Sequence, residues 1–164
     1  AEGGPSLKHC AELVRRYSTV PALDLRRLVA WVFFNVFTGN NDSHAKNLSI
    51  YSPAPGVVRL TPFYDLMCTR IYPGLAQHFA LNIGGTSLPG DMARAHWVAM
   101  AEQLNLRPAF VLRTGTALAA QLPAALDKAV QAMAPLLAPN DAVMAERLVQ
   151  WVGRATRQTL KRME

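Results

Sequence analysis

The sequence is poor in cysteine, in charge and in long apolar runs, and each shortage excludes a class of protein. Two cysteines in 164 residues, Cys10 and Cys68, lie far apart and outside any CxxC pair. Neither a disulfide scaffold nor a zinc finger is therefore indicated, and we expect both to be buried free thiols in a reducing cytoplasm. A charged fraction of 17% beside a hydrophobic fraction of 51% is typical of a folded globular domain.

No run of residues reaches the roughly 20 apolar positions that a membrane-spanning helix requires. The most apolar run, Leu28 to Phe37, contains Asn35 and is better explained by a buried helix. The N-terminus has neither an initiator Met nor a basic region followed by an apolar core, so no secretory signal is indicated. We expect a cytoplasmic protein without a membrane partner, and a chain that is a fragment of something longer.

The spacing of apolar residues predicts a mainly α fold that occupies residues 1–164 as one domain. Ser6 is a suitable N-cap for the first helix, and Gly39 a suitable end for the second and most apolar one. Pro123 predicts a kink in the fourth helix. The five predicted helices cover residues 7–17, 21–37, 91–104, 108–133 and 140–162.

Short strands are predicted at residues 48–51, 57–60 and 79–83. The first two are joined by a segment rich in proline and glycine and form a hairpin, whose ends place Asn47 beside Asp65. Residues 66–70 are predicted to form one helical turn. The pair Gly84–Gly85 is better explained by a plain turn than by a phosphate-binding loop, because no helix follows it at once.

Polar side chains with catalytic potential gather in two segments, at residues 38–47 and 61–65. Phosphoryl transfer from ATP requires Mg²⁺ ligands and a carboxylate that orients the acceptor hydroxyl and takes its proton. Asp42 and Asn47 have the spacing of the protein-kinase catalytic loop HRDxxxxN, and Asp65 takes the place of the metal-binding Asp that follows it. Mg²⁺ prefers such carboxylate and amide oxygens.

Two other interpretations of these residues stay open. Asp42 and Asn47 could form Asx turns that cap the hairpin, although this leaves Asp65 unexplained. Asp42, His44 and Asp65 could instead be ligands of a hydrolytic metal centre, although such centres usually contain more His ligands.

The segment from Asn41 to Ser49 (NDSHAKNLS), followed by Leu60 to Leu66 (LTPFYDL), closely resembles the catalytic and metal-binding loops of HipA-family serine/threonine kinases. These are the toxin components of HipBA toxin–antitoxin modules. The resemblance extends to Glu2–Pro5 and to Leu122–Asp127, so it implies that the chain is the C-terminal lobe of such a kinase. The pattern DxHxxN is also similar to the catalytic loop of phosphoinositide kinases, which are more distant relatives.

The resemblance implies a role for each polar residue. Asp42 would be the catalytic base, assisted by His44 and Lys46, which would lie near the γ-phosphate of ATP or support the loop. Asn47 and Asp65 would bind Mg²⁺. The full enzyme would phosphorylate a serine or threonine of a protein substrate, plausibly an aminoacyl-tRNA synthetase, and thereby arrest growth.

The chain contains no Gly-rich loop and no lysine on a strand before Asp42; only Lys8 precedes it, in the first predicted helix. HipA-type kinases carry these ATP-covering parts in an N-terminal portion. We therefore expect the isolated chain to have weak or no ATP turnover.

The net charge of +6 favours acidic partners, and five basic residues fall in the last eighteen positions: Arg147, Arg154, Arg157, Lys161 and Arg162. They form either a solvated helix face or contacts with DNA phosphates beside a HipB-like helix-turn-helix antitoxin, the partner that the resemblance implies. The alternative to a kinase is a non-catalytic helical module that binds a repressor or DNA.

Overall fold

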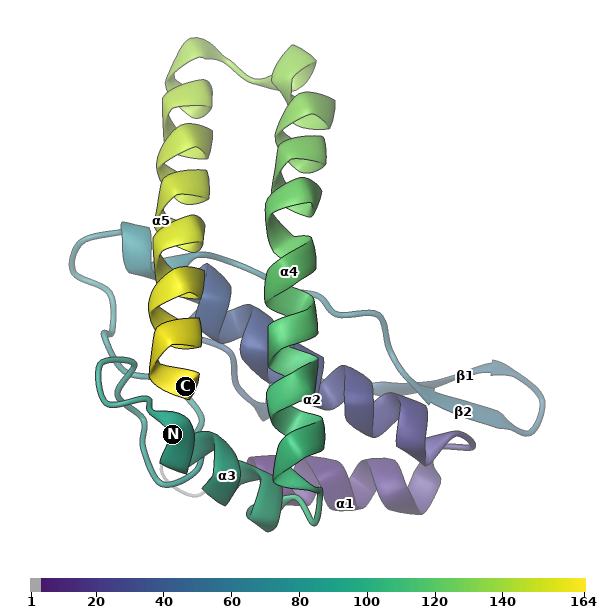
Figure 1. Ribbon diagram of the computed structural model, residues 1–164. Coiled ribbons are helices and arrows are strands. Elements are labelled where there is room, and N and C mark those ends of the chain that lie inside the picture. Colours follow the sequence, from purple (N-terminus) through teal and green to yellow (C-terminus); the bar gives the residue numbers. More distant parts are fainter. Residues whose placement is uncertain (1–3) are drawn as a thin grey trace.

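The computed structural model describes residues 4–164, which fold into helices around one small β-hairpin (Figure 1). The elements are α1 (Leu7–Tyr17), α2 (Pro21–Thr38), the 3₁₀ turn η1 (Ala45–Asn47), β1 (Ile50–Ala54), β2 (Val57–Leu60), the 3₁₀ turn η2 (Thr69–Ile71), α3 (Arg94–Gln103), α4 (Pro108–Met133), the 3₁₀ turn η3 (Ala134–Leu136) and α5 (Pro139–Met163). The predicted mainly α fold with a small hairpin is confirmed, and all five predicted helices are present. Glu2 and Gly3, which carry part of the family resemblance, lie outside the described residues.

Local sequence signals fix the ends of the first two helices. The Ser6 hydroxyl accepts a hydrogen bond from the backbone N–H of His9, whose ring in turn accepts from the Ser6 N–H, so α1 starts with a reciprocal cap. Pro21 occupies the first turn of α2, and Gly39 ends it in the left-handed conformation at φ 69°. Both proline and glycine are suited to these positions.

Helix α2 is the centre of the core and lies behind α4 and α5 in Figure 1. Its Phe33 is fully buried and stacks on Trp97 of α3 with ring centroids 3.9 Å apart. Gly115 of α4 allows this packing, because a Cβ at that position would come within 2.4 Å of the Phe33 ring. The buried free thiol expected at Cys68 is confirmed, whereas the free thiol of Cys10 is only partly buried.

Helices α4 and α5 run side by side and project beyond the rest of the molecule (Figure 1). Helix α4 continues through Pro123. Residues Pro108–Leu136 are long and apolar enough to cross a membrane by length and composition alone. Val111 and Leu122 of this helix are buried in the core, so packing against α2 and α5 gives an alternative explanation for its apolar composition.

Asp24 ties the hairpin to the start of α2. The sequence placed it in the first turn, and the structure shows a fully buried carboxylate that accepts hydrogen bonds from Ser18 Oγ at 2.7 Å, from the Leu60 N–H at 2.9 Å and from Arg59 Nη2 at 3.1 Å. Burial raises the pKa of Asp24, but these donors outweigh it and hold the pKa below its ordinary value. The strand that leads to Asp65 is thereby anchored to the helical core.

Three predicted element positions and one predicted strand were wrong. Strand β1 begins at Ile50 and not at residue 48, because Leu48 still caps η1. Residues 79–83 bury alternate side chains, but their backbone bonds to Thr86 and Ser87 make only one isolated bridge, Ile83 to Thr86, and no regular strand ladder. The helical turn expected at 66–70 occurs at Thr69–Ile71. Helix α3 begins three residues late, where the His96 ring accepts a hydrogen bond from the Ala93 N–H.

Candidate functional site

The side chain of Asn40 connects the loop that follows α2 to the end of α2 and to the segment that carries Asp65. Asn40 is 1% exposed; its amide donates to Asn35 Oδ1 at 2.9 Å and to the Asp65 carbonyl at 3.1 Å. Asp65 itself has φ 56°, a left-handed conformation that is uncommon outside glycine. The hydrogen bond from Asn40 therefore helps hold Asp65 in an unfavourable backbone conformation beside the loop.

Asn47 and Asp65 meet across the open end of the hairpin, as the sequence predicted. Asn47 Nδ2 donates to Asp65 Oδ2 at 2.6 Å, while Asn47 Oδ1 accepts from the His44 N–H at 2.8 Å. Asn47 is buried and Asp65 is exposed. The amide nitrogen of Asn47 thus contacts the Asp65 carboxylate where the two polar segments converge, while the amide oxygen is bonded to the loop at His44.

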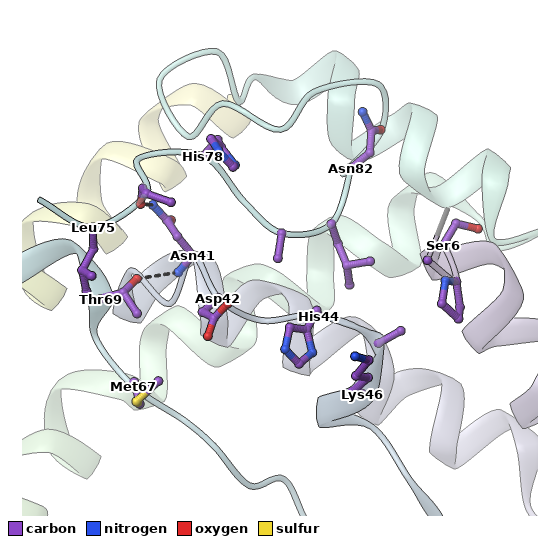
Figure 2. A pocket seen from close by; sticks show the side chains of 16 residues that line it. Ser6, Asn41, Asp42, His44, Lys46, Met67, Thr69, Leu75, His78 and Asn82 are labelled. Carbon is purple, nitrogen blue, oxygen red and sulfur yellow. Dashed lines mark hydrogen bonds between the residues drawn. The ribbon is translucent and has the colours of Figure 1, made fainter. Parts of the chain in front are cut away.

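Asp42, His44 and Lys46 line one cleft with a volume of about 790 Å³. Asp42 and Lys46 are exposed, and His44 is half-buried. Figure 2 shows these three side chains following one another along the loop. Asn47 and Asp65 are not part of the described lining of this cleft. The site thus has an open part, with a carboxylate and a cationic side chain, and an adjoining amide–carboxylate pair.

The opposite wall of the cleft is a loop that hydrogen bonds to the residues before Asp42. The hydroxyl of Thr69 accepts from the Asn41 N–H at 2.9 Å and donates to the Gly39 carbonyl at 3.1 Å. The Asn41 amide donates to the Ala76 carbonyl at 2.9 Å. These bonds fix the position of the loop relative to its wall (Figure 2).

Helix α5 reaches the base of the same loop. Trp151 packs so closely on Gly39 that a Cβ at Gly39 would lie 2.3 Å from its ring. The Gly39 carbonyl also accepts from the Arg70 N–H at 3.2 Å. The C-terminal helix and the cleft wall therefore meet at Gly39, where α2 turns into the loop that carries Asp42, His44 and Lys46.

Three buried polar atoms of the loop have no hydrogen-bond partner in the described part of the chain: Asn40 Oδ1, Asn41 Oδ1 and His44 Nδ1. Groups of three or more His, Cys, Asp or Glu side chains that could hold a metal do not occur within residues 4–164. The interpretation of Asp42, His44 and Asp65 as a hydrolytic metal centre thus gains no support.

Sequence reasoning did not find the residues that hold the site together. Asn40, Asn41 and Thr69 act through hydrogen bonds over 25 to 35 residues of chain, a separation at which the sequence gives no sign of pairing. A partial signal was present, because two asparagines directly after a helix-ending glycine are unusual without a role in a turn.

Comparison with known proteins places the chain in a family. The model of the HipA-like C-terminal domain matches residues 1–131. This chain belongs to that family. The resemblance stated from the sequence is confirmed, and the chain is a C-terminal domain of a kinase-related family.

Relatives of the HipA-like domain include named kinases. "Putative kinase Y4mE" of Sinorhizobium fredii is 38% identical over 106 residues, which cover 65% of this chain and 25% of that protein. The "Serine/threonine-protein kinase toxin HipA" of Shewanella oneidensis is 26% identical over 137 residues, 84% of this chain and 31% of the relative. The chain therefore spans about a quarter to a third of the length of these relatives.

A solved structure shows the same fold. A chain in the complex of the Shewanella oneidensis MR-1 toxin–antitoxin proteins HipA and HipB with operator DNA superimposes with a TM-score of 0.89. The match covers 99% of this chain and 38% of that chain at 24% identity. It shows that residues 4–164 adopt the architecture of the HipA-like C-terminal domain.

Proposed function

We propose that this chain forms the catalytic C-terminal part of a serine/threonine protein kinase that transfers the γ-phosphoryl group of ATP to a protein hydroxyl. The observation that carries the proposal is the 2.6 Å contact between Asn47 and Asp65, next to a cleft in which Asp42 is exposed. A hairpin brings the two segments together in the arrangement that a kinase catalytic loop and metal-binding loop require.

Each polar residue then has a distinct task. Asp42 accepts a hydrogen bond from the acceptor hydroxyl, orients its oxygen and takes its proton as transfer proceeds. Lys46 and His44 lie on the same cleft wall, where a cation stabilises the negative charge of phosphate oxygens. The hydrogen bond from the His44 N–H to Asn47 Oδ1 fixes the cleft residues relative to the Asn47–Asp65 pair.

The amide–carboxylate pair fits Mg²⁺. Asp65 has a second carboxylate oxygen without a hydrogen bond from the described residues, and Asn47 Oδ1 keeps one lone pair beside its bond to His44. Asp65 and Asn47 would therefore hold the ion, which prefers one or two such oxygens and completes its shell with phosphate and water. Bound there, Mg²⁺ would neutralise phosphate charge during transfer.

The remaining features of the full protein are part of the same proposal. It would act in the cytoplasm as the toxin of a toxin–antitoxin module, with a HipB-like helix-turn-helix partner and, through that partner, DNA. The structural relative was solved in such an assembly. The five basic residues near the C-terminus are all exposed, which leaves both a solvated face and a DNA contact open.

The proposal is tested by phosphoryl transfer with radiolabelled ATP, using the longer protein that carries this domain with an N-terminal nucleotide-binding portion. Asp42→Asn should lower the rate by about 10²–10⁴-fold, the contribution of a general base. Asp91→Asn, at an exposed aspartate outside the cleft, is the matched control and should leave the rate unchanged.

One result would contradict this function: a wild-type rate in the Asp42→Asn variant with unchanged circular dichroism. Efficient Mg²⁺-dependent transfer by residues 1–164 alone would instead contradict the expectation that this chain, which lacks a Gly-rich loop of its own, has weak or no ATP turnover. A non-catalytic module would instead bind DNA or a repressor with no dependence on Mg²⁺ or on Asp42.

A further inference from the structure

The segment that follows the hairpin exposes an unusual number of large apolar side chains. Within twelve residues, five such side chains are between 42 and 48% exposed: Tyr64, Leu66, Met67, Tyr72 and Leu75. Isolated exposed apolar residues are common on soluble proteins, but a concentration of them marks a binding surface. Met67 and Leu75 also line the cleft that contains Asp42.

The cleft has two chemically different ends, and Asp42 stands between them. Figure 2 shows Met67 and Leu75 on one side of Asp42, and His44 and Lys46 on the other. The cationic end attracts phosphate oxygens. The opposite end offers a thioether and an aliphatic side chain, which gain free energy only by covering apolar groups.

We propose that the Met67–Leu75 end of the cleft binds the acceptor polypeptide through an apolar side chain next to the serine or threonine that is phosphorylated. This inference rests on the proposed kinase function, because it takes Asp42 as the group that receives the acceptor hydroxyl. A side chain adjacent to that hydroxyl reaches Met67 and Leu75 from the same cleft, and a charged side chain packed against these two residues would lose hydration without gaining a polar partner from them.

The position of the two residues favours a transient occupant over a permanent one. A fixed segment that covered Met67 and Leu75 would fill the same cleft and obstruct access to Asp42. The wall that carries these side chains is also well supported, because Asn41 donates to the Ala76 carbonyl at 2.9 Å and Thr69 bonds the base of the loop. A supported wall with exposed apolar side chains suits repeated binding and release of a peptide.

The test measures peptide binding by fluorescence anisotropy in the absence of ATP. Short labelled peptides contain one serine, and the residues on either side of it are leucine, phenylalanine, aspartate or lysine. Peptides with an apolar neighbour should bind on the order of tenfold more tightly than those with aspartate, as expected for the burial of one apolar side chain. Met67→Asp and Leu75→Asp should abolish this preference.

Leu88→Asp is the matched control, because Leu88 is 50% exposed and is not part of the described cleft lining. This variant should keep the full preference. Equal binding of all peptides, no binding of any peptide, or a preference that survives both cleft substitutions would overturn the inference. So would displacement of the peptide by the rest of the longer chain, which would identify that segment as the occupant.

The binding assay contains no nucleotide, so its result is independent of the kinase assay. One outcome is a preference for apolar peptides that depends on Met67 and Leu75, without phosphoryl transfer that depends on Asp42. It would support a peptide-binding cleft and refute the kinase function. Transfer that depends on Asp42, with no apolar preference, would support the kinase and refute the acceptor site.

Discussion

Replacement of the buried Asp24 at the start of α2 should destabilise the hairpin that positions Asp65. Asp24 is 0% exposed and receives hydrogen bonds from a hydroxyl, a backbone N–H and the guanidinium of Arg59. In Asp24→Asn the charge is lost, and the new amide N–H faces a group that is itself a donor. The Leu60 N–H and the Arg59 guanidinium then compete for one carbonyl oxygen.

The expected loss is large compared with the total stability. Asp24 is buried, but the Arg59 side chain is 25% exposed and can still reach water, so loss of the charged hydrogen-bond acceptor costs about 1.5–3 kcal/mol, against a total free energy of unfolding of order 10 kcal/mol for a domain. Because Leu60 ends β2 and Arg27 donates to the Leu60 carbonyl at 2.8 Å, the damage should concentrate in the hairpin and in the segment that carries Asp65.

Urea unfolding followed by circular dichroism measures the difference in free energy of unfolding between the wild type and Asp24→Asn. The direction in which this difference changes with pH follows from the pKa of Asp24. The pKa of Asp24 is lower in the folded protein than in the unfolded one. Its stabilising contribution is therefore complete above the unfolded pKa of about 4 and is lost as the pH falls further, through the folded pKa. Asp24→Asn should be much less stable than the wild type at neutral pH, and the gap should narrow below about pH 4.

Two results would refute this reasoning. One is a variant within about 1 kcal/mol of the wild type at neutral pH, which is the range of ordinary substitutions. The other is a gap that stays constant as the pH falls, because an interaction that depends on an ionised carboxylate must disappear when it is protonated. Asp91→Asn, at an exposed aspartate, should change stability by less than about 0.5 kcal/mol.

Two glycine positions give further tests by thermal or urea unfolding. Gly39→Ala should cost about 1–3 kcal/mol from the clash with Trp151, in addition to the strain of a non-glycine residue at φ 69°. Only the part due to the clash should vanish in a Trp151→Ala background; fully additive effects would show that the two residues are not in contact. Gly84→Ala should be far more harmful than Gly56→Ala, although both glycines have positive φ, since only a Cβ at Gly84 would strike the backbone carbonyl of His96, at 1.8 Å. Equal losses would contradict the crowding at Gly84.

The helices could be predicted because their signals are local. Ser6, Gly39 and Pro108 stand at element ends, and both long C-terminal helices begin and end within a residue of the predicted positions. The proximity of Asn47 and Asp65 was also predictable, because a hairpin necessarily brings its two ends together. Local capping and the hairpin turn thus gave most of the fold and the central pair of the site.

The remaining features depend on contacts that the sequence does not encode locally. Apolar alternation at 79–83 was real, since Phe79, Leu81 and Ile83 are buried. A strand also needs a regular ladder, whereas this segment bonds to the backbone of Thr86 and Ser87 and forms only one isolated bridge. The role of Asp24 was missed for a similar reason. Its partner Arg59 is 35 residues away, and an acid in the first turn of a helix is already explained by the helix dipole.

The contact between α5 and Gly39 also bears on where this domain stops as a folding unit. The family model ends at residue 131, ahead of α5, yet Val152 and Met163 are buried and Trp151 packs on Gly39, which starts the loop that carries Asp42. A protein cut at the end of the matched region would expose the flank of α2 and α4 to water and free that turn. Expression boundaries, and searches for related sequences, should therefore treat the last helix as part of the domain.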